Sequence, residues 1–258
     1  MSAINRSQIR KTNKLINKGV TAEVYVALDI STNQRYALKL INKQTIDQKY
    51  ITPIRREIEI VMTLDHPHIV RTYDVIETPR SIKILMELFS GNLLEFYQRN
   101  GRLNEYQAYI IFRQIASAID YLHNEKHIVH RDIKLANILF NNDQDMTVVL
   151  ADFGFAIRRE PTDPLITNIA GTPRYMAPEL KSRSPNKGYP ADIYALGICL
   201  YTLVVGEYPD HFLNLNKVQT NSSLPNLLRR MLDQNEDGRL TIREVINHPW
   251  MLSFHPGE

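Results

Sequence analysis

The chain contains 258 residues, with 31 Lys and Arg against 28 Asp and Glu, a formal net charge of +3 and 43% apolar residues. This length and apolar content allow one or two domains to bury a core without disulfides or metals. The small net charge argues against binding to nucleic acid or another polyanion. The single cysteine, Cys199, lies in an apolar run, so we expect a buried thiol and an intracellular protein, cytoplasmic or nuclear.

The sequence does not predict a membrane protein. Basic residues near the N-terminus, such as Arg6 and Arg10, are not followed by the apolar stretch of a secretory signal. The most apolar run, residues 194–205, is too short to cross a bilayer and predicts a buried helix. We therefore expect a chain that does not contact membranes, with a monomer as the default oligomeric state.

The first third of the chain alternates in the manner of strands. Residues 24–28 and 36–40 predict a hairpin, and apolar residues at helical spacing from Ile54 to Met62 then predict one face of a helix. Two more strands are predicted at 70–76 and 82–87. This part should be a small antiparallel sheet with one main helix.

Helical patterns dominate after residue 91. An apolar stripe predicts a helix from about residue 104 to residue 123, and residues 192–205 are apolar on nearly every side, as expected of a central helix. The two parts together predict an α+β fold with two lobes of unequal size.

Three strings carry the residues of chemical interest. His-Arg-Asp-Ile-Lys-Leu-Ala-Asn occupies residues 130–137, Asp-Phe-Gly follows at 152–154, and Gly-Thr-Pro-Arg-Tyr-Met-Ala-Pro-Glu follows at 171–179. In this order the chain resembles the eukaryotic-type protein kinases, and the match runs from about residue 15 to Trp250. The ordered set is far more specific than any one string.

This resemblance implies a bilobal fold that binds ATP and Mg²⁺ and phosphorylates protein substrates. The implied single kinase domain covers residues 10–254, between short tails at 1–9 and 255–258. Its implied parts are an N-lobe at 10–86, a hinge at 87–92 and a C-lobe at 93–254.

The resemblance also assigns roles to charged residues. Lys39 would contact the α- and β-phosphates of ATP, with Glu57 as the partner that positions it. Asp152 and Asn137 would supply oxygen ligands to Mg²⁺.

Two residues are implied in the transfer step itself. Asp132 would orient the substrate hydroxyl and accept its proton, and Lys134 would stabilise charge on the transferring phosphoryl group.

The nucleotide would meet a further set of residues. The phosphate-covering loop would include Asn17, Lys18 and Gly19. Val24, Ala37 and Leu139 would sandwich the adenine, with Met86 as gatekeeper and the backbone of Glu87 and Phe89 as hinge hydrogen-bonding groups.

Other residues are implied in structural roles. His130 and Phe153 would be packing elements of the core, and Asp192 would anchor the 130–137 loop from the buried helix. Glu179 would pair with Arg239.

Lys134 together with Gly171-Thr172-Pro173 favours the serine/threonine branch, because the tyrosine branch usually has Arg near position 136, where this chain has Ala136. The string from Asp237 to Trp250 resembles the last helix of the calmodulin-dependent kinase group. Before it, residues 211–223 look shorter than the docking region of most relatives.

The phosphate-covering loop departs from the family pattern, since only Gly19 of its three glycines is kept and Asn17 and Ala22 replace the others. Two alternatives to a protein kinase therefore stay open. One is a pseudokinase that serves as a scaffold, and the other is a kinase of small molecules.

Activation and specificity are also unusual. Asn168 stands at the usual phosphate acceptor position of the activation loop, beside Thr167, so we expect activity without phosphorylation there. Leu93 and Ala136 replace carboxylates that read upstream arginines in basophilic relatives, which predicts a weak preference for basic substrates, although Glu95 is nearby.

Overall fold

The computed structural model describes residues 6–141, 146–160, 162–209, 214–218 and 220–254. The chain divides into two compact units, Met1–Phe89 (unit 1) and Ser90–Glu258 (unit 2). Each unit is built around its own buried residues, and each is described by itself.

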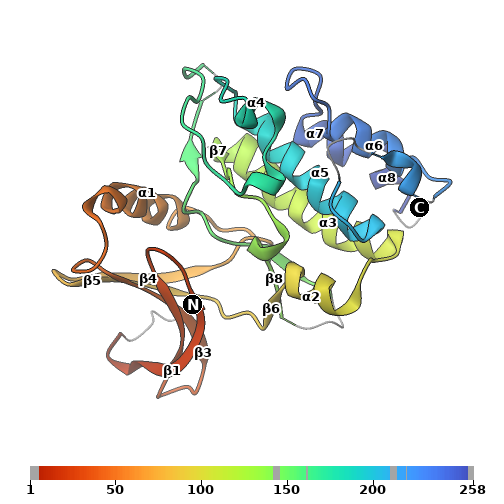
Figure 1. The fold of residues 1–258 in the computed structure, drawn as a ribbon. Coiled ribbons are helices and arrows are strands. Elements are labelled where there is room, and N and C mark those ends of the chain that lie inside the picture. Colours follow the sequence, from red (N-terminus) through yellow and green to blue (C-terminus); the bar gives the residue numbers. More distant parts are fainter. Residues whose placement is uncertain (1–5, 142–145, 161, 210–213, 219, 255–258) are drawn as a thin grey trace. The chain divides into compact units, whose positions relative to one another are not determined.

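Unit 1 is a five-stranded antiparallel sheet with the strand order β1-β2-β3-β5-β4 and one α-helix (Figure 1). The predicted hairpin, helix and two further strands are confirmed. The bounds are β1 Ile9–Lys18, β2 Glu23–Asp29, β3 Arg35–Asn42, α1 Ile51–Val61, β4 Thr72–Glu77 and β5 Ser81–Met86.

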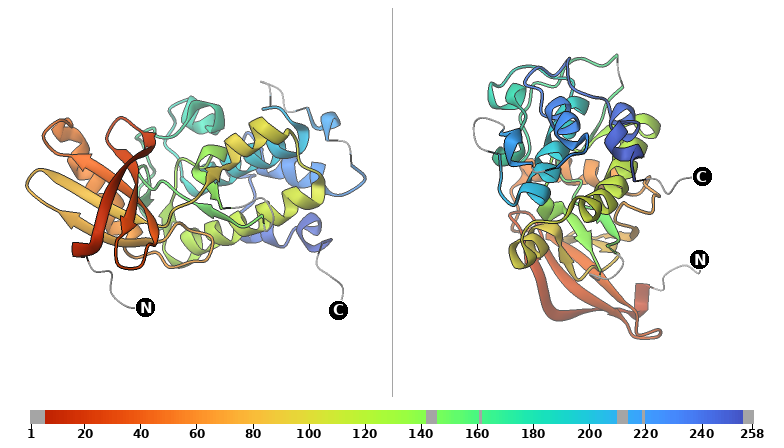
Figure 2. Two further views of the ribbon diagram at one scale, coloured as in Figure 1. Left: turned by 90° about the horizontal axis from the view of Figure 1, so that it is seen from below. Right: turned by 90° about the vertical axis from the view of Figure 1, so that its right-hand side faces the viewer.

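Strand β1 was not predicted. Its side chains are mostly exposed, and two register shifts between Lys11 and Asn17 interrupt its pairing with β2. Such irregularities increase the local twist of a strand, and β1 is strongly twisted (Figure 2).

Side chains alternate between the two faces of the unit 1 sheet. On one face, Ile41, Ile82 and Ile84 form a buried cluster with Ile54 of α1. On the opposite face, a second buried cluster contains Ala27, Tyr36, Leu38 and Leu85. The central strands β3 and β5 are therefore apolar on both faces, although α1 packs against only one.

Unit 2 is mainly helical. The helices predicted at 104–123 and 192–205 are confirmed as α3 (Glu105–Asp120), which continues into a π-helical turn at Tyr121–Glu125, and α5 (Tyr189–Val205). The other helices are α2 Leu93–Asn100, α4 Pro178–Lys181, α6 Leu224–Met231, α7 Ile242–Ile246 and α8 Pro249–Leu252.

Helix α5 is the centre of unit 2, since every residue from 191 to 203 is buried. Helix α6 packs against α5 and α7 packs against α3 (Figure 1). Cys199 is buried as predicted, and burial raises the pKa of its thiol. None of the helices in the described ranges is long and apolar enough to cross a membrane.

Two small sheets complete unit 2. β8 (Ile138–Phe140) pairs with β6 (Gly91–Asn92) and with β9 (Val148–Leu150), while β7 (Ile128–Val129) pairs with β10 (Ile157–Arg158). The β8–β9 hairpin matters for the site because its open end carries two of the predicted ligand residues.

The end of unit 2 differs from the single last helix that the resemblance implied. The chain forms α7 and α8, which are separated at Asn247 and His248, because the His248 side chain caps α8 and Pro249 occupies its first turn. Part of the shortened segment predicted at 211–223 lies outside the described residues.

A glycine before α5 offers a test of this fold. Gly188 has φ +82°, and an added Cβ would lie 2.6 Å from the Ile166 side chain. We expect Gly188→Ala to lower the free energy of unfolding by about 2 kcal/mol, measured by urea denaturation.

Gly19→Ala is the matched control. Gly19 lies outside the left-handed region, and the nearest atom to an added Cβ is the Ala22 oxygen at 3.6 Å. This variant should lose no stability. Equal losses in the two variants would contradict the conformation described for Gly188.

Candidate active site

An ion pair joins β3 to α1 within unit 1. The Lys39 Nζ lies 2.5 Å from the Glu57 Oε1, and only 16% and 9% of their side-chain surfaces are exposed. Glu57 faces inward because it shares the buried face of α1 with Ile54 and Ile60. Removing Lys39 would take away the cation beside this largely buried carboxylate, which is costly. The structure thus brings together the two residues that the sequence paired.

Two predicted adenine contacts and the predicted gatekeeper share a sheet face with Lys39. In the register of the strands, Val24 lies opposite Lys39 and Ala37 lies opposite Met86. Because residues two apart on β3 point to the same side, Val24, Ala37, Lys39 and Met86 lie on the face against which α1 packs.

The predicted phosphate loop is the turn between β1 and β2. Asn17 pairs with Val24, and the Gly19 N–H donates to the Ala22 carbonyl at 2.9 Å. The Lys18 ammonium lies 2.8 Å from the Glu23 carboxylate in an exposed ion pair.

The predicted hinge residues Glu87 and Phe89 lie at the end of unit 1. The Glu87 N–H donates to the Arg71 carbonyl at 2.9 Å, so of the two backbone groups of Glu87 it is the carbonyl that can serve a ligand. Burial raises the pKa of the Glu87 carboxyl, and Arg71 opposes that shift.

In unit 2, the β8–β9 hairpin brings Asn137 and Asp152 to one end. Asn137 precedes β8 and Asp152 follows β9, and the Ala151 N–H donates to the Asn137 carbonyl at 2.8 Å. Asp152 is exposed and has φ +64°. Leu139 is half-buried between the buried Ile138 and Phe140.

The donor set at this end of the hairpin fits magnesium. The Asn137 Nδ2 donates to the Asp132 backbone oxygen at 2.8 Å, which directs the amide oxygen of Asn137 to another partner. The described residues contain no group of three His, Cys, Asp or Glu that could hold a metal ion. The amide oxygen of Asn137 and the carboxylate of Asp152 are hard oxygen donors, of the kind that suit Mg²⁺ arriving with substrate phosphates.

Asp132 is the centre of a buried polar network. Its Oδ2 accepts from the Lys134 Nζ at 2.6 Å and from the Asn137 Nδ2 at 3.1 Å, and its Oδ1 accepts from the Thr172 hydroxyl at 2.7 Å. The Lys134 Nζ also donates to the Thr172 Oγ1 at 3.0 Å. Thr172 was not assigned a role from the sequence, although its place in the 171–179 string was visible.

The predicted anchor of the 130–137 loop is present. The Asp192 carboxylate accepts from the backbone N–H groups of His130 and Arg131, both at 2.8 Å, and lies 3.0 Å from the His123 Nε2. Arg131 has φ +70°, and a Cβ added at Gly171 would meet its carbonyl oxygen at 2.5 Å. The residue before Asp132 is therefore held in an uncommon conformation.

His130 and Phe153 are buried, with ring centroids 4.9 Å apart. The His130 Nδ1 accepts from the Asp132 N–H at 3.3 Å, so the ring proton lies on Nε2, 3.2 Å from the Ala151 carbonyl. Burial lowers the pKa of His130 despite the carboxylates of Asp132, Asp152 and Asp192. The imidazole is neutral.

Comparison with known proteins agrees with this geometry. Residues 10–251 match the model of the family described as the protein kinase domain. The chain belongs to the protein kinase domain family. The predicted α+β fold, with an antiparallel sheet and one helix in unit 1 and a helical unit 2, is confirmed.

Several serine/threonine kinases are similar to this kinase domain. It is 36% identical over 261 residues to the human NUAK family SNF1-like kinase 1, a match that covers 96% of this chain and 38% of that protein. It is 36% identical to the probable serine/threonine-protein kinase MARK-A of Dictyostelium discoideum (86% and 22%), and 35% identical to the mouse serine/threonine-protein kinase SIK1 (92% and 32%). The chain thus spans less than two fifths of each relative.

The activation loop, the segment that contains Thr167 and Asn168, contacts Arg131 directly. The Arg131 Nη2 donates to the Asn168 backbone carbonyl at 2.8 Å. Part of the hydrogen-bonding capacity of the Arg131 guanidinium is therefore already used by a neutral carbonyl.

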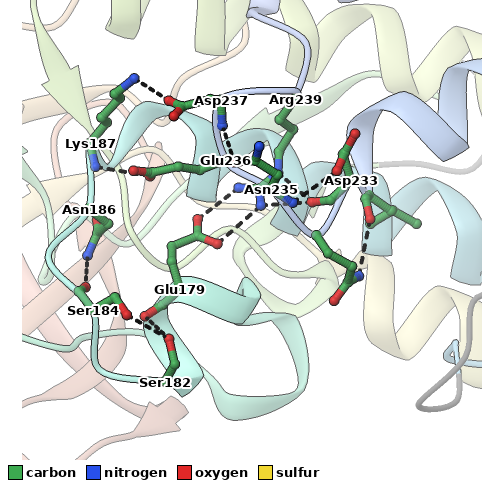
Figure 3. A network of polar contacts seen from close by, with 12 residues as sticks. Glu179, Ser182, Ser184, Asn186, Lys187, Asp233, Asn235, Glu236, Asp237 and Arg239 are labelled. Atoms are coloured by element: carbon green, nitrogen blue, oxygen red, sulfur yellow. Dashed lines mark hydrogen bonds and ion pairs between the residues drawn. The ribbon is translucent and has the colours of Figure 1, made fainter.

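A second polar network holds α4 to the loop before α7 (Figure 3). Arg239 is buried and donates to both carboxylate oxygens of Glu179, at 2.8 and 3.1 Å, and to the Asp233 carbonyl at 2.9 Å. The predicted Glu179–Arg239 pair is confirmed.

Residues 233–244 also match the spacing of a calcium-binding loop, Asp-x-Asn-x-Asp-Gly followed by Glu244. The side chains serve other purposes. Asp233 and Asn235 accept backbone N–H groups within the loop, Asp237 pairs with Lys187 (Figure 3), and Glu244 forms a capping box with Thr241. The spacing here reflects turns and a helix cap.

The buried imidazole predicts a pH dependence. A lowered folded-state pKa means that the unfolded chain binds more protons below about pH 6.5, so stability should fall as the pH drops from about 6.5 to 5. His248, whose pKa is also lowered mainly by burial, contributes too. Each histidine adds at most about 1.4 kcal/mol per pH unit to the slope of the free energy of unfolding.

Urea denaturation across this pH range checks the assignment. His130→Phe should reduce the slope of the free energy of unfolding against pH, whatever its effect on absolute stability. His248→Asn, which keeps a helix-capping residue, should remove the contribution of His248 to that slope. An unchanged slope in His130→Phe would contradict a neutral buried His130.

Proposed function

We propose that this chain is an ATP-dependent protein serine/threonine kinase that transfers the γ-phosphoryl group to hydroxyls of protein substrates. The observation that carries the proposal is the Asp132 carboxylate, fixed by Lys134, Asn137 and Thr172. The names of the similar serine/threonine kinases support it.

Unit 1 contributes to nucleotide binding in this proposal. Lys39 binds the α- and β-phosphates, and Glu57 holds its ammonium in place. Val24, Ala37 and Met86 offer apolar surface to the adenine from the same sheet face, while Glu87 and Phe89 offer backbone groups. Asn17, Lys18 and Gly19 form the turn that covers the phosphates.

Unit 2 contributes the metal ligands and the transfer residues. Asn137 and Asp152 hold Mg²⁺, which when bound neutralises phosphate charge, and Leu139 contacts the adenine. The Thr172 hydroxyl donates to the Asp132 Oδ1, and a substrate hydroxyl has the same donor chemistry. Asp132 therefore orients that hydroxyl and accepts its proton, and Lys134 stabilises the transferring group.

Substrate range and context follow from the same resemblance. The single catalytic domain is placed at residues 10–254, and it acts on proteins inside the cell, in the cytoplasm or nucleus, as a monomer by default. Leu93 and Ala136 stand where basophilic relatives have carboxylates. Arginines upstream of the phosphorylated residue should therefore add little to the binding of a substrate.

A pseudokinase is the second candidate, and the β1–β2 turn is the observation that favours it. Only one of the three glycines is present, and Lys18 is paired with Glu23. Against it stand the intact Lys39–Glu57 pair and the Asp132 network.

Phosphate transfer to a pool of proteins and peptides tests the proposal. With labelled ATP, we expect transfer by the unchanged chain and a loss of about 10²- to 10⁴-fold in Asp132→Asn, because the amide cannot accept the hydroxyl proton. A thermal melt of both proteins serves as the folding control. Equal incorporation by both would refute the role of Asp132, and none by either would favour the pseudokinase.

Activity should not require phosphorylation of the activation segment, because Arg131 already donates to the Asn168 carbonyl. We expect a phosphatase-treated chain, and a chain carrying both Thr162→Ala and Thr167→Ala, to keep activity within about twofold of the untreated protein. Inactivity of the dephosphorylated chain together with loss in the double variant would show that this expectation is wrong.

A further inference from the structure

The unit 1 sheet leaves an apolar face without a helix. Helix α1 packs over Ile41, Ile82 and Ile84. The other face presents Leu38 and Leu85, which are 6% and 4% exposed, and Leu40, which is half-buried. An antiparallel sheet with one covered face usually carries polar residues on the other. These leucines depart from that pattern.

A cavity of about 240 Å³ lies on this face. Leu38, Leu40 and Leu85 form its floor, and Ile9 and Ile76 are among its walls. Pockets for drug-sized ligands usually have volumes of about 300 to 1,000 Å³, so this cavity suits a molecule at or below the lower end of that size range.

The rim of the cavity is positively charged. Arg6 and Asp74 both line it and neutralise each other through hydrogen bonds of 2.6 and 2.7 Å. Lys11 lines it with its Nζ 3.6 Å from the centroid of the Tyr25 ring, and Lys83 is exposed. Among the described residues, neither lysine has a carboxylate within ion-pair distance, although the Glu23 carboxylate, which pairs with Lys18, also attracts Lys11. The rim therefore has a surplus of two cations above an apolar floor.

We propose that this cavity binds a small amphipathic anion, with an aromatic or branched apolar body and one acidic group. The body packs on Leu38, Leu40 and Leu85, and the acidic group meets Lys11 and Lys83. A neutral apolar molecule would make only the contacts with the leucine floor, and a hydrophilic anion would make only the contacts with the lysines of the rim. The floor belongs to β3, the strand whose opposite face presents Lys39.

The probe is 8-anilinonaphthalene-1-sulfonate, which joins an apolar body to one anionic group. Its fluorescence is titrated with the whole chain in saturating MgADP, so that the nucleotide site is filled. We expect saturable binding of one equivalent, and at least about fivefold weaker binding of N-phenyl-1-naphthylamine, which has the same body without the sulfonate.

Charge reversal locates the site. Lys11→Glu combined with Lys83→Glu should weaken sulfonate binding at least about fivefold, whereas Lys14→Glu, an exposed lysine of β1 outside the cavity, should change it by less than about twofold. Both variants alter exposed residues, and a thermal melt checks that they fold.

Three results would overturn the proposal. They are probe binding that is seen without MgADP but lost in saturating MgADP, equal binding of the neutral analogue, and equal weakening by Lys14→Glu and the double variant.

Discussion

The Asp192 carboxylate is the group on which the unit 2 site depends. It lies on α5, in which every residue from 191 to 203 is buried, and it accepts hydrogen bonds from the backbone N–H groups of His130 and Arg131. Arg131 has a positive φ that a non-glycine residue rarely adopts, so two charge-assisted hydrogen bonds offset the strain. The direction of the next residue, Asp132, follows from this anchor.

The network around Asp132 extends that constraint to the metal ligands. Asn137 donates to Asp132 and also begins the β8–β9 hairpin, whose other strand leads to Asp152. Buried polar networks stabilise one arrangement only when every member has its partners. In unit 1 the Lys39–Glu57 pair is likewise fixed by packing. The apolar face of α1 is buried, and Glu57 lies on that same face, so its carboxylate is directed to Lys39.

Much of this arrangement could be predicted from the sequence, for different reasons. The strand-like pattern of residues 24–28 and 36–40 predicted β2 and β3, and helical spacing predicted α1 and α3. A run that is apolar on nearly every side predicted α5. The resemblance to protein kinases brought Lys39 together with Glu57 and Asp132 with Lys134, which no local pattern could do. The roles assigned to these residues stay predictions.

Other features depend on tertiary structure. Strand β1 is mostly exposed and irregular, so it lacks an alternating pattern. The bond from Thr172 to Asp132 joins residues 40 positions apart, and the cavity over Leu38 and Leu85 exists only in the register of neighbouring strands. The break between α7 and α8 arises because the His248 side chain caps α8 and Pro249 follows it. The pattern of apolar residues continues through this break and does not reveal it.

Amide hydrogen exchange tests the central claim most directly. If Asp192 anchors the loop, the N–H groups of His130 and Arg131 should exchange as slowly as those of α5 in the unchanged chain. In Asp192→Ala they should lose this protection, while the amides of α3 keep theirs. Fast exchange in the unchanged chain, or protection that survives the substitution, would contradict the account.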